Sequence, residues 1–238
     1  MRQNCFPISY SLFFIFMVVL SVTAIFVPAS LAADALSGEE APLRVKHVEI
    51  RGVKIRLPIP DGYEEMRRED HPETYDWLVK TNSDEIILPL AYLINSEDKT
   101  TLSQGAPIVG LRYGVARSEK LYWGDCIDDE RLDYFKTLVK DFVRAVAKRV
   151  DDVGASKNTV PMDRSLLHEG KKSMSFLNVM QGNWPGFFYK TAYCKSFIVA
   201  DKKIVEVTLW RDAYKDIEIQ ALIDDALFYL KKIDNSKY

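Results

Sequence analysis

The chain has few of the features that indicate a catalytic or cofactor site. It has three cysteines and three histidines among 238 residues, without a C-x-x-C pair or an H-E-x-x-H motif, so neither a redox pair nor zinc has a local signal. The phosphate-binding patterns G-x-x-x-x-G-K-[ST] and G-x-G-x-x-G are missing, as is the G-x-S-x-G of many serine hydrolases. We therefore expect no metal, no cofactor and no catalytic residue, and we favour a non-enzymatic protein.

An excess of charge of one sign is also lacking. Lys and Arg together number 32 and Asp and Glu 34, for a formal net charge of −2 at pH 7. Binding to nucleic acid or to anionic membrane requires a basic patch, so we predict neither kind of partner. After residue 33 no apolar run approaches the roughly 20 residues of a transmembrane helix.

The one long apolar run lies near the N-terminus. Arg2 precedes an almost unbroken apolar stretch over residues 12–27, and small residues follow up to position 33. This is the pattern of a signal peptide, with an uncleaved anchor as the alternative. We predict a signal peptide over residues 1–33, a flexible acidic leader over 34–43 and a single domain over 44–238. The protein would then be periplasmic or secreted.

The cysteines of the mature chain could be either bridged or reduced. Removal of the signal peptide takes away Cys5 and leaves Cys126 and Cys194. In an oxidising compartment the two would form a disulfide, worth roughly 4 kcal/mol in the chain-entropy model. The alternative is two reduced, buried thiols, because Cys194 lies on the apolar side of a predicted strand.

The strongest structural signal is a long β-hairpin over residues 187–211, which is rich in aromatic and β-branched residues. A two-residue turn at Asp201-Lys202 would place Cys194 opposite Leu209 and Ile198 opposite Val205, on one apolar face. Lys195 and Glu206 would lie diagonally on the other face. That second face carries most of the aromatic residues.

The aromatic face is the candidate binding surface, because rings mixed with polar groups suit a ligand or a protein partner. Its residues are Trp184 at the entrance, then Tyr189, Tyr193, Phe197 and Trp210. The alternative is that a helix covers this face as core. Burial of Tyr193, Phe197 and Trp210 together beneath a helix would exclude the binding interpretation.

The remaining patterns predict an antiparallel α+β sandwich, in which helices flank a β-sheet. A second hairpin over 45–57 turns at Arg51-Gly52, and Asp70 is the expected N-cap of a short helix. The longest helix is expected over 128–153, with an apolar stripe at helical spacing that includes Phe135, Leu138 and Phe142. Further strands are expected at 85–94, 107–117 and 174–180, and Pro89 places a bulge or an edge in the first of them. A polar excursion is expected at 156–172, and a final helix begins at residue 216.

This element order resembles the Mog1/PsbP-like α/β sandwich of exported and lumenal proteins. The resemblance rests on the N-terminal hairpin around RLPIPDGY and on the late hairpin followed by a helix. It spans most of residues 44–233 without a diagnostic motif. It implies an accessory, interaction or assembly factor with no shared catalytic residues.

We therefore expect an exported, non-enzymatic binding or accessory domain of the cell envelope, whose partner is an envelope protein or a small ligand. One alternative is a hydrolase-like periplasmic enzyme with a loop-assembled site around His71 and His168. A second alternative is a structural subunit of an envelope assembly, which predicts a sizeable exposed apolar patch.

Overall fold

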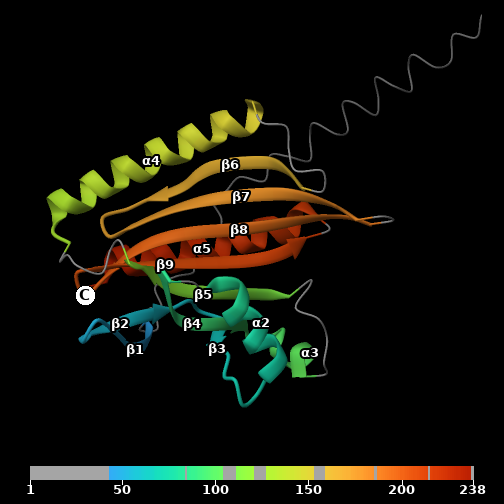
Figure 1. Ribbon diagram of the computed structural model, residues 1–238, viewed down its shortest axis with the longest axis horizontal. Coiled ribbons are helices and arrows are strands. Elements are labelled where there is room, and N and C mark those ends of the chain that lie inside the picture. The colour runs from blue at the N-terminus through green and yellow to red at the C-terminus, as the bar shows by residue number, and fades with distance from the viewer. Residues whose placement is uncertain are drawn as a thin grey trace, which may run out of the picture. The chain divides into compact units, whose positions relative to one another are not determined.

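The computed structural model describes residues 43–83, 85–103, 111–120, 127–152, 159–184, 187–213 and 215–236. They belong to one compact unit, Leu43–Tyr238, and form nine strands and four helices (Figure 1). The predicted signal peptide and almost all of the predicted leader lie outside the described residues. Within the described ranges, no helix has the length and apolar character needed to cross a membrane.

The elements follow one another as hairpins separated by helices. The strands are β1 Arg44–Ile50, β2 Val53–Ile59, β3 Tyr63–Glu65, β4 Ile87–Asn95, β5 Arg112–Glu119, β6 Thr159–Glu169, β7 Ser173–Trp184, β8 Phe187–Ala200 and β9 Lys203–Ala213. The helices are α2 Pro72–Asn82, α3 Lys99–Ser103, α4 Asp129–Asp152 and α5 Asp216–Asn235. Strands β3 to β9 build one antiparallel sheet in the order β3-β4-β5-β9-β8-β7-β6, and β1 and β2 form a separate hairpin. The predicted α+β class, an antiparallel sheet flanked by helices, is confirmed.

The central hairpin has the predicted register. Cys194 pairs with Leu209 and Ile198 with Val205. The turn residues Asp201 and Lys202 have φ values of 44° and 65°, which is the left-handed geometry whose twist matches the flanking strands. This turn therefore fixes which side chains of β8 and β9 share a face.

One face of the sheet is a continuous apolar core. Helix α5 and the β1–β2 hairpin cover it, and Cys194, Ile198, Val205 and Leu209 pack there with Leu222 and other residues of α5. Figure 1 shows α5 running behind strands β8 and β9. The prediction that this side of the hairpin lies beneath a long helix is confirmed.

The opposite face is covered in two separate places. Helix α2 covers the β4–β5 part, where Leu78 packs with Tyr92 and Val115. Helix α4 covers the β7–β8 part near the β8–β9 turn, where Phe135 packs with Phe197. The predicted aromatic binding face lies on this side, between the two helices.

Three expectations about local structure are wrong. Residues 156–172 contain strand β6 rather than a polar excursion, and β6 pairs with β7 through two register irregularities. An edge strand tolerates polar residues and bulges because one of its sides needs no partner, which weakens its apolar pattern. The short strand β3 was not expected at all. Helix α2 begins at Pro72 with His71, not Asp70, as its N-cap. The predicted irregularity at Pro89 is confirmed as a register shift between Pro89 and Ala91.

Candidate functional site

The predicted aromatic face is divided between two environments. Phe197 is 9% exposed, and its ring meets Phe135 of α4 edge-on, with 5.4 Å between ring centroids. Tyr193 and Trp210 are half-buried. The backbones of Trp184 and Tyr189 lie in β7 and β8, and their side chains lie outside the described part of the structure. The aromatic face as a whole is therefore not buried beneath a helix.

Three aromatic rings form a row across β5, β9 and β8. Trp210 stacks on Tyr113 with 5.4 Å between centroids and 7° between planes, and Tyr193 tilts against Trp210 at 5.9 Å. Burial raises the pKa of Tyr113 well above its ordinary value, and the charge of Asp212 adds to this. The Tyr113 phenol therefore stays neutral throughout the physiological range.

A buried charge lies next to this row. Glu206 is 1% exposed, and its Oε1 accepts hydrogen bonds from Arg117 Nε at 2.8 Å and from Thr208 Oγ1 at 3.0 Å. Lys195 Nζ lies 3.1 Å from Oε2, the diagonal pairing expected from the sequence. This contact lacks the alignment of a hydrogen bond, and Oε2 has no hydrogen-bond partner among the described residues.

Helix α4 packs on the sheet along only part of its apolar stripe. Phe135, Val139 and Val143 contact the cluster around Phe197, whereas Leu138 and Phe142 are 49% and 67% exposed. The apolar stripe predicted for this helix is therefore only partly buried. The flank of the stripe that carries Leu138 and Phe142 thus keeps much of its surface in contact with water.

A groove of about 520 Å³ runs between α4 and the sheet, and we call it the α4 groove. Its volume falls in the range typical of ligand sites. Most of its lining is apolar. These apolar residues are Phe135, Leu138, Val139, Phe142 and Val143 from α4 and Phe176 and Phe197 from the sheet. The polar lining residues are Glu119, Asn178, Tyr193 and Lys195.

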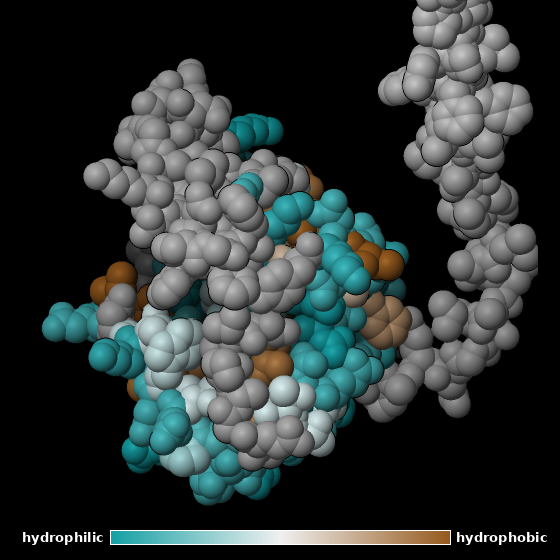
Figure 2. Space-filling view, turned by 90° about the vertical axis from the view of Figure 1, so that its right-hand side faces the viewer, coloured by the Kyte–Doolittle hydropathy of each residue, from teal (hydrophilic) through white to brown (hydrophobic). Residues whose placement is uncertain are grey.

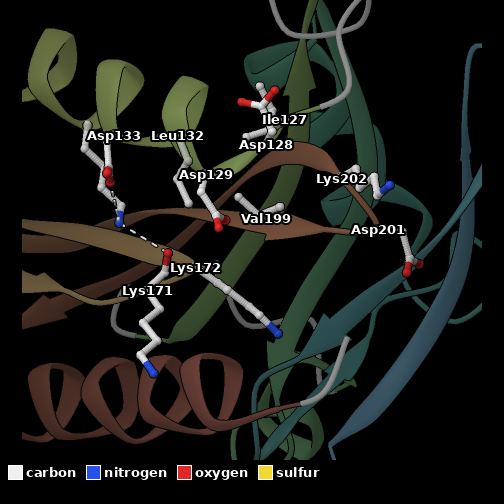
Figure 3. A pocket seen from close by; sticks show the side chains of 11 residues that line it. Ile127, Asp128, Asp129, Leu132, Asp133, Lys171, Lys172, Val199, Asp201 and Lys202 are labelled. Carbon is white, nitrogen blue, oxygen red and sulfur yellow. Dashed lines mark hydrogen bonds and ion pairs between the residues drawn. The ribbon is translucent and has the colours of Figure 1, made fainter.

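A second, larger cavity of about 840 Å³ lies at the start of α4 (Figure 3). Its acidic lining residues include Asp128, just before α4, and Asp129 and Asp133 of α4. Its lysines come from α4 and from the β6–β7 and β8–β9 turns. In Figure 3 the side chain of Lys171 extends away from these carboxylates. No group of three or more His, Cys, Asp or Glu side chains among the described residues is arranged to hold a metal ion. This cavity is a mixed-charge surface rather than a built site.

The two histidines of the enzyme alternative are not brought together. His71 begins α2, which packs on β4, and His168 lies on β6. Four strands separate β4 from β6, which amounts to roughly 24 Å at the usual strand spacing. His168 Nε2 lies 2.7 Å from Asp234 Oδ2, and Ser173 Oγ donates to the same carboxylate oxygen at 2.9 Å. The serine thus bonds the carboxylate, which is not the nucleophile–base arrangement that hydrolysis requires.

The predicted disulfide stays a prediction. Cys194 is fully buried against the α5 side of the sheet, and burial, with a contribution from Asp225, raises the pKa of its thiol to about 12. Cys126 lies outside the described residues.

On the face shown in Figure 2, the visible described residues are mostly hydrophilic, and the hydrophobic ones form small, separate patches. Scattered patches of this kind are ordinary on protein surfaces.

Comparison with known proteins finds similarity in fold only. No family model matches the chain, and no curated protein matches it. The Ran-binding protein Mog1p of Saccharomyces cerevisiae is 13% identical with a TM-score of 0.35, over 80% of this chain and 93% of that one. LpqN of Mycobacterium tuberculosis, involved in cell envelope biogenesis, is 17% identical with a TM-score of 0.33, over 82% and 89%. Both matches agree with the resemblance to the Mog1/PsbP-like sandwich, and at these TM-scores they carry no argument about ligand or site.

The sequence missed most of the groove. The sequence pattern identified Tyr193 and Phe197 as candidates. It placed Leu138 and Phe142 only on the apolar stripe of a helix, and Phe176 only within a predicted strand. The width of the apolar stripe on α4 was the signal that could have indicated the groove. The stripe is broader than packing against the sheet alone requires.

Proposed function

We propose that this chain is an exported, non-enzymatic binding domain of the cell envelope, and that the α4 groove is its ligand site. The exposure of Leu138 and Phe142 in a groove whose lining is mostly apolar carries the proposal. Apolar side chains that line a concavity and remain in contact with water gain free energy when an apolar ligand displaces that water. Export rests on the signal-peptide pattern over residues 1–33.

The free energy available in the groove is sufficient for a small apolar ligand. Full burial of a Leu or Phe side chain is worth about 1.5–3 kcal/mol. Because about half of Leu138 and two thirds of Phe142 remain exposed, the two together offer roughly 2–3 kcal/mol. The walls formed by Phe176 and Phe197 are already fixed by packing, so little side-chain ordering opposes binding.

Binding is tested with N-phenyl-1-naphthylamine, a neutral apolar fluorophore whose emission rises and shifts to the blue outside water. We expect saturable binding to the exported protein and about tenfold weaker binding to Phe142→Ser, because the substitution removes an apolar wall. Ile217→Ser is the matched control, since Ile217 is 75% exposed on α5, which covers the opposite face. Equal losses in the two variants, or no saturable binding, would contradict the proposal.

Export is tested separately by determining the N-terminus of the protein recovered from the envelope or medium. We expect the chain to begin after Ala32, Ala33 or Ala35, where small residues fit a signal-peptidase site. A protein that retains Met1 and stays with the membrane would support the uncleaved anchor instead.

The structural-subunit alternative predicts that the same exposed residues hold another protein chain. Gel filtration of the exported protein distinguishes the two. A monomer that binds the fluorophore supports the ligand site, whereas an oligomer that Phe142→Ser dissociates supports the subunit.

A further inference from the structure

We infer that the ligand of the α4 groove is a long-chain amphiphile with a carboxylate head, and that Lys195 holds that head. The inference rests on the proposed function, since it names the class of molecule that occupies the same groove. Its starting observation is that a groove with a mostly apolar lining contains one ammonium group, that of Lys195 on β8.

Lys195 is held in the groove by its neighbours. Its Nζ lies 3.1 Å from Glu206 Oε2 and 5.8 Å from the centroid of the Phe197 ring. Its side chain is 31% exposed, and no side-chain hydrogen bond of Lys195 involves another described residue. The ammonium is therefore positioned by charge and by an aromatic face, while its N–H groups remain available to an acceptor in the groove.

The local charge balance favours an anion at this point. Glu206 faces two cations, because Arg117 Nη2 lies 2.7 Å from its Oε1 on the side opposite Lys195. The three groups together carry one net positive charge. A ligand carboxylate at Lys195 would restore neutrality, and a charge-assisted hydrogen bond in a partly dehydrated groove is stronger than a neutral one.

The one other charged residue of the groove, Glu119, is offset from Lys195 along the sheet. Glu119 is four residues beyond Val115 on β5, and Val115 lies level with Lys195 two strands across. The two Cα positions are thus roughly 17 Å apart by strand geometry, so Glu119 is not a cross-strand or diagonal neighbour of Lys195. Neither Asn178 nor the groove residues of α4 bear charge.

The apolar lining on both sides of Lys195 accounts for the rest of the ligand. Phe176 of β7 and Phe197 of β8 flank it on the sheet, and Phe142 lies across the groove on α4. An unbranched alkyl chain fills a space walled by flat rings and flexible aliphatic side chains without requiring further polar partners. A compact polar ligand would leave these walls in contact with water.

The test measures displacement of N-phenyl-1-naphthylamine by dodecanoate and by 1-dodecanol, which share a chain and differ in the head group. In the exported wild-type protein we expect dodecanoate to displace the fluorophore at about fivefold lower concentration, the scale of a partly exposed ion pair. Lys195→Met should abolish this preference while leaving displacement by dodecanol unchanged. Lys195→Arg, which keeps the charge, should retain the preference and thereby show that the site is intact.

Lys140→Met is the matched control. Lys140 is a similarly exposed lysine, 27% for its side chain, and it pairs with Glu169 rather than lining the groove. It should keep the wild-type preference. Equal displacement by acid and alcohol in the wild type, or a preference that survives in Lys195→Met, would overturn the inference while leaving the apolar site in place. Failure of the fluorophore to bind at all would instead refute the proposed function.

Discussion

At the residue scale, Glu206 shows how a charged side chain is accommodated in the middle of a sheet. It is 1% exposed and faces Arg117 and Lys195. We expect Glu206→Leu to lower the free energy of unfolding by about 1–3 kcal/mol, because it leaves two partly buried cations without their carboxylate. Urea unfolding measures the loss.

An exposed carboxylate provides the comparison for that variant. Glu97 pairs with Arg112, and its side chain is 79% exposed. Glu97→Gln should therefore change the unfolding free energy by no more than about 0.5 kcal/mol. If Glu206→Leu proved as stable as the wild type, the buried pair would have no role in stability.

We expect the Cys194 thiol not to react with thiol reagents in the folded protein. Its thiol pKa of about 12 leaves roughly one molecule in ten thousand as thiolate at pH 8, and the residue has no exposed surface. In a Cys126→Ser background, a thiol reagent at pH 8 should react only as urea unfolds the chain. Rapid reaction with the native protein would show that the α5 face opens.

Residue identities on the hairpin could be predicted, whereas their exposure could not. The pairing of Cys194 with Leu209 follows from alternation and a two-residue turn, both of which are local properties. The exposure of Phe142 depends on where α4 lies relative to the sheet, and that is set by contacts between residues far apart in the chain. A helical stripe predicts an apolar side of a helix and cannot say how much of it is covered.

At the scale of elements, α4 is held along one flank of its apolar stripe. Phe135 contacts Phe197 edge-on, while Phe142 is 67% exposed. We expect Phe135→Ala to destabilise the protein by about 2–3 kcal/mol and Phe142→Ala by less than about 0.5 kcal/mol, as measured by thermal or urea unfolding. Equal losses would mean that the helix packs more evenly than the structure indicates.

The β1–β2 hairpin is tied to the β8–β9 turn by one carboxylate. Asp201 Oδ2 accepts the backbone N–H of Arg56 at 2.7 Å and its Nε at 3.1 Å. The hydrogen bond from the Arg56 side chain holds the pKa of Asp201 below its ordinary value.

This pair gives a pH dependence with a definite sign. A depressed folded pKa contributes stability above the unfolded value near 3.9, and the contribution is lost as pH falls through the folded pKa. The stability difference between wild type and Asp201→Asn should therefore be constant from pH 5 to 7 and shrink below about pH 4. Because Arg56 is 46% exposed at its side chain, we expect at most about 1 kcal/mol. A difference that grows in acid would contradict this assignment.

Helices and strands with a clear hydrophobic periodicity could be predicted from the sequence, whereas the edge strand of the sheet could not. Helix α5 and hairpin β8–β9 carry clear apolar patterns, and both are found where expected. Strand β6 is polar, bulged and at the edge of the sheet, so its sequence looks like a loop. Its identity as a strand comes from pairing with β7, which is information that the segment itself does not contain.

At the scale of the whole domain, the two faces of the sheet have separate roles. Helix α5 closes one face as core, and helices α2 and α4 leave the middle of the other face partly open. The sequence could predict a two-faced sheet and could name the undecided face. It could not place the opening beside α4, because that opening depends on how α4 lies on the sheet, which the local pattern of neither element contains.

Tyr193 connects the α4 groove to the row of aromatic rings. It lines the groove and contacts Trp210, and Trp210 stacks on Tyr113. Any molecule that moves the Tyr193 ring must alter the surroundings of the indole. Occupancy of the α4 groove should therefore be measurable by the intrinsic fluorescence of the protein, without an added label. The signal would be the part of the ligand-induced change in tryptophan emission that disappears in Trp210→Phe.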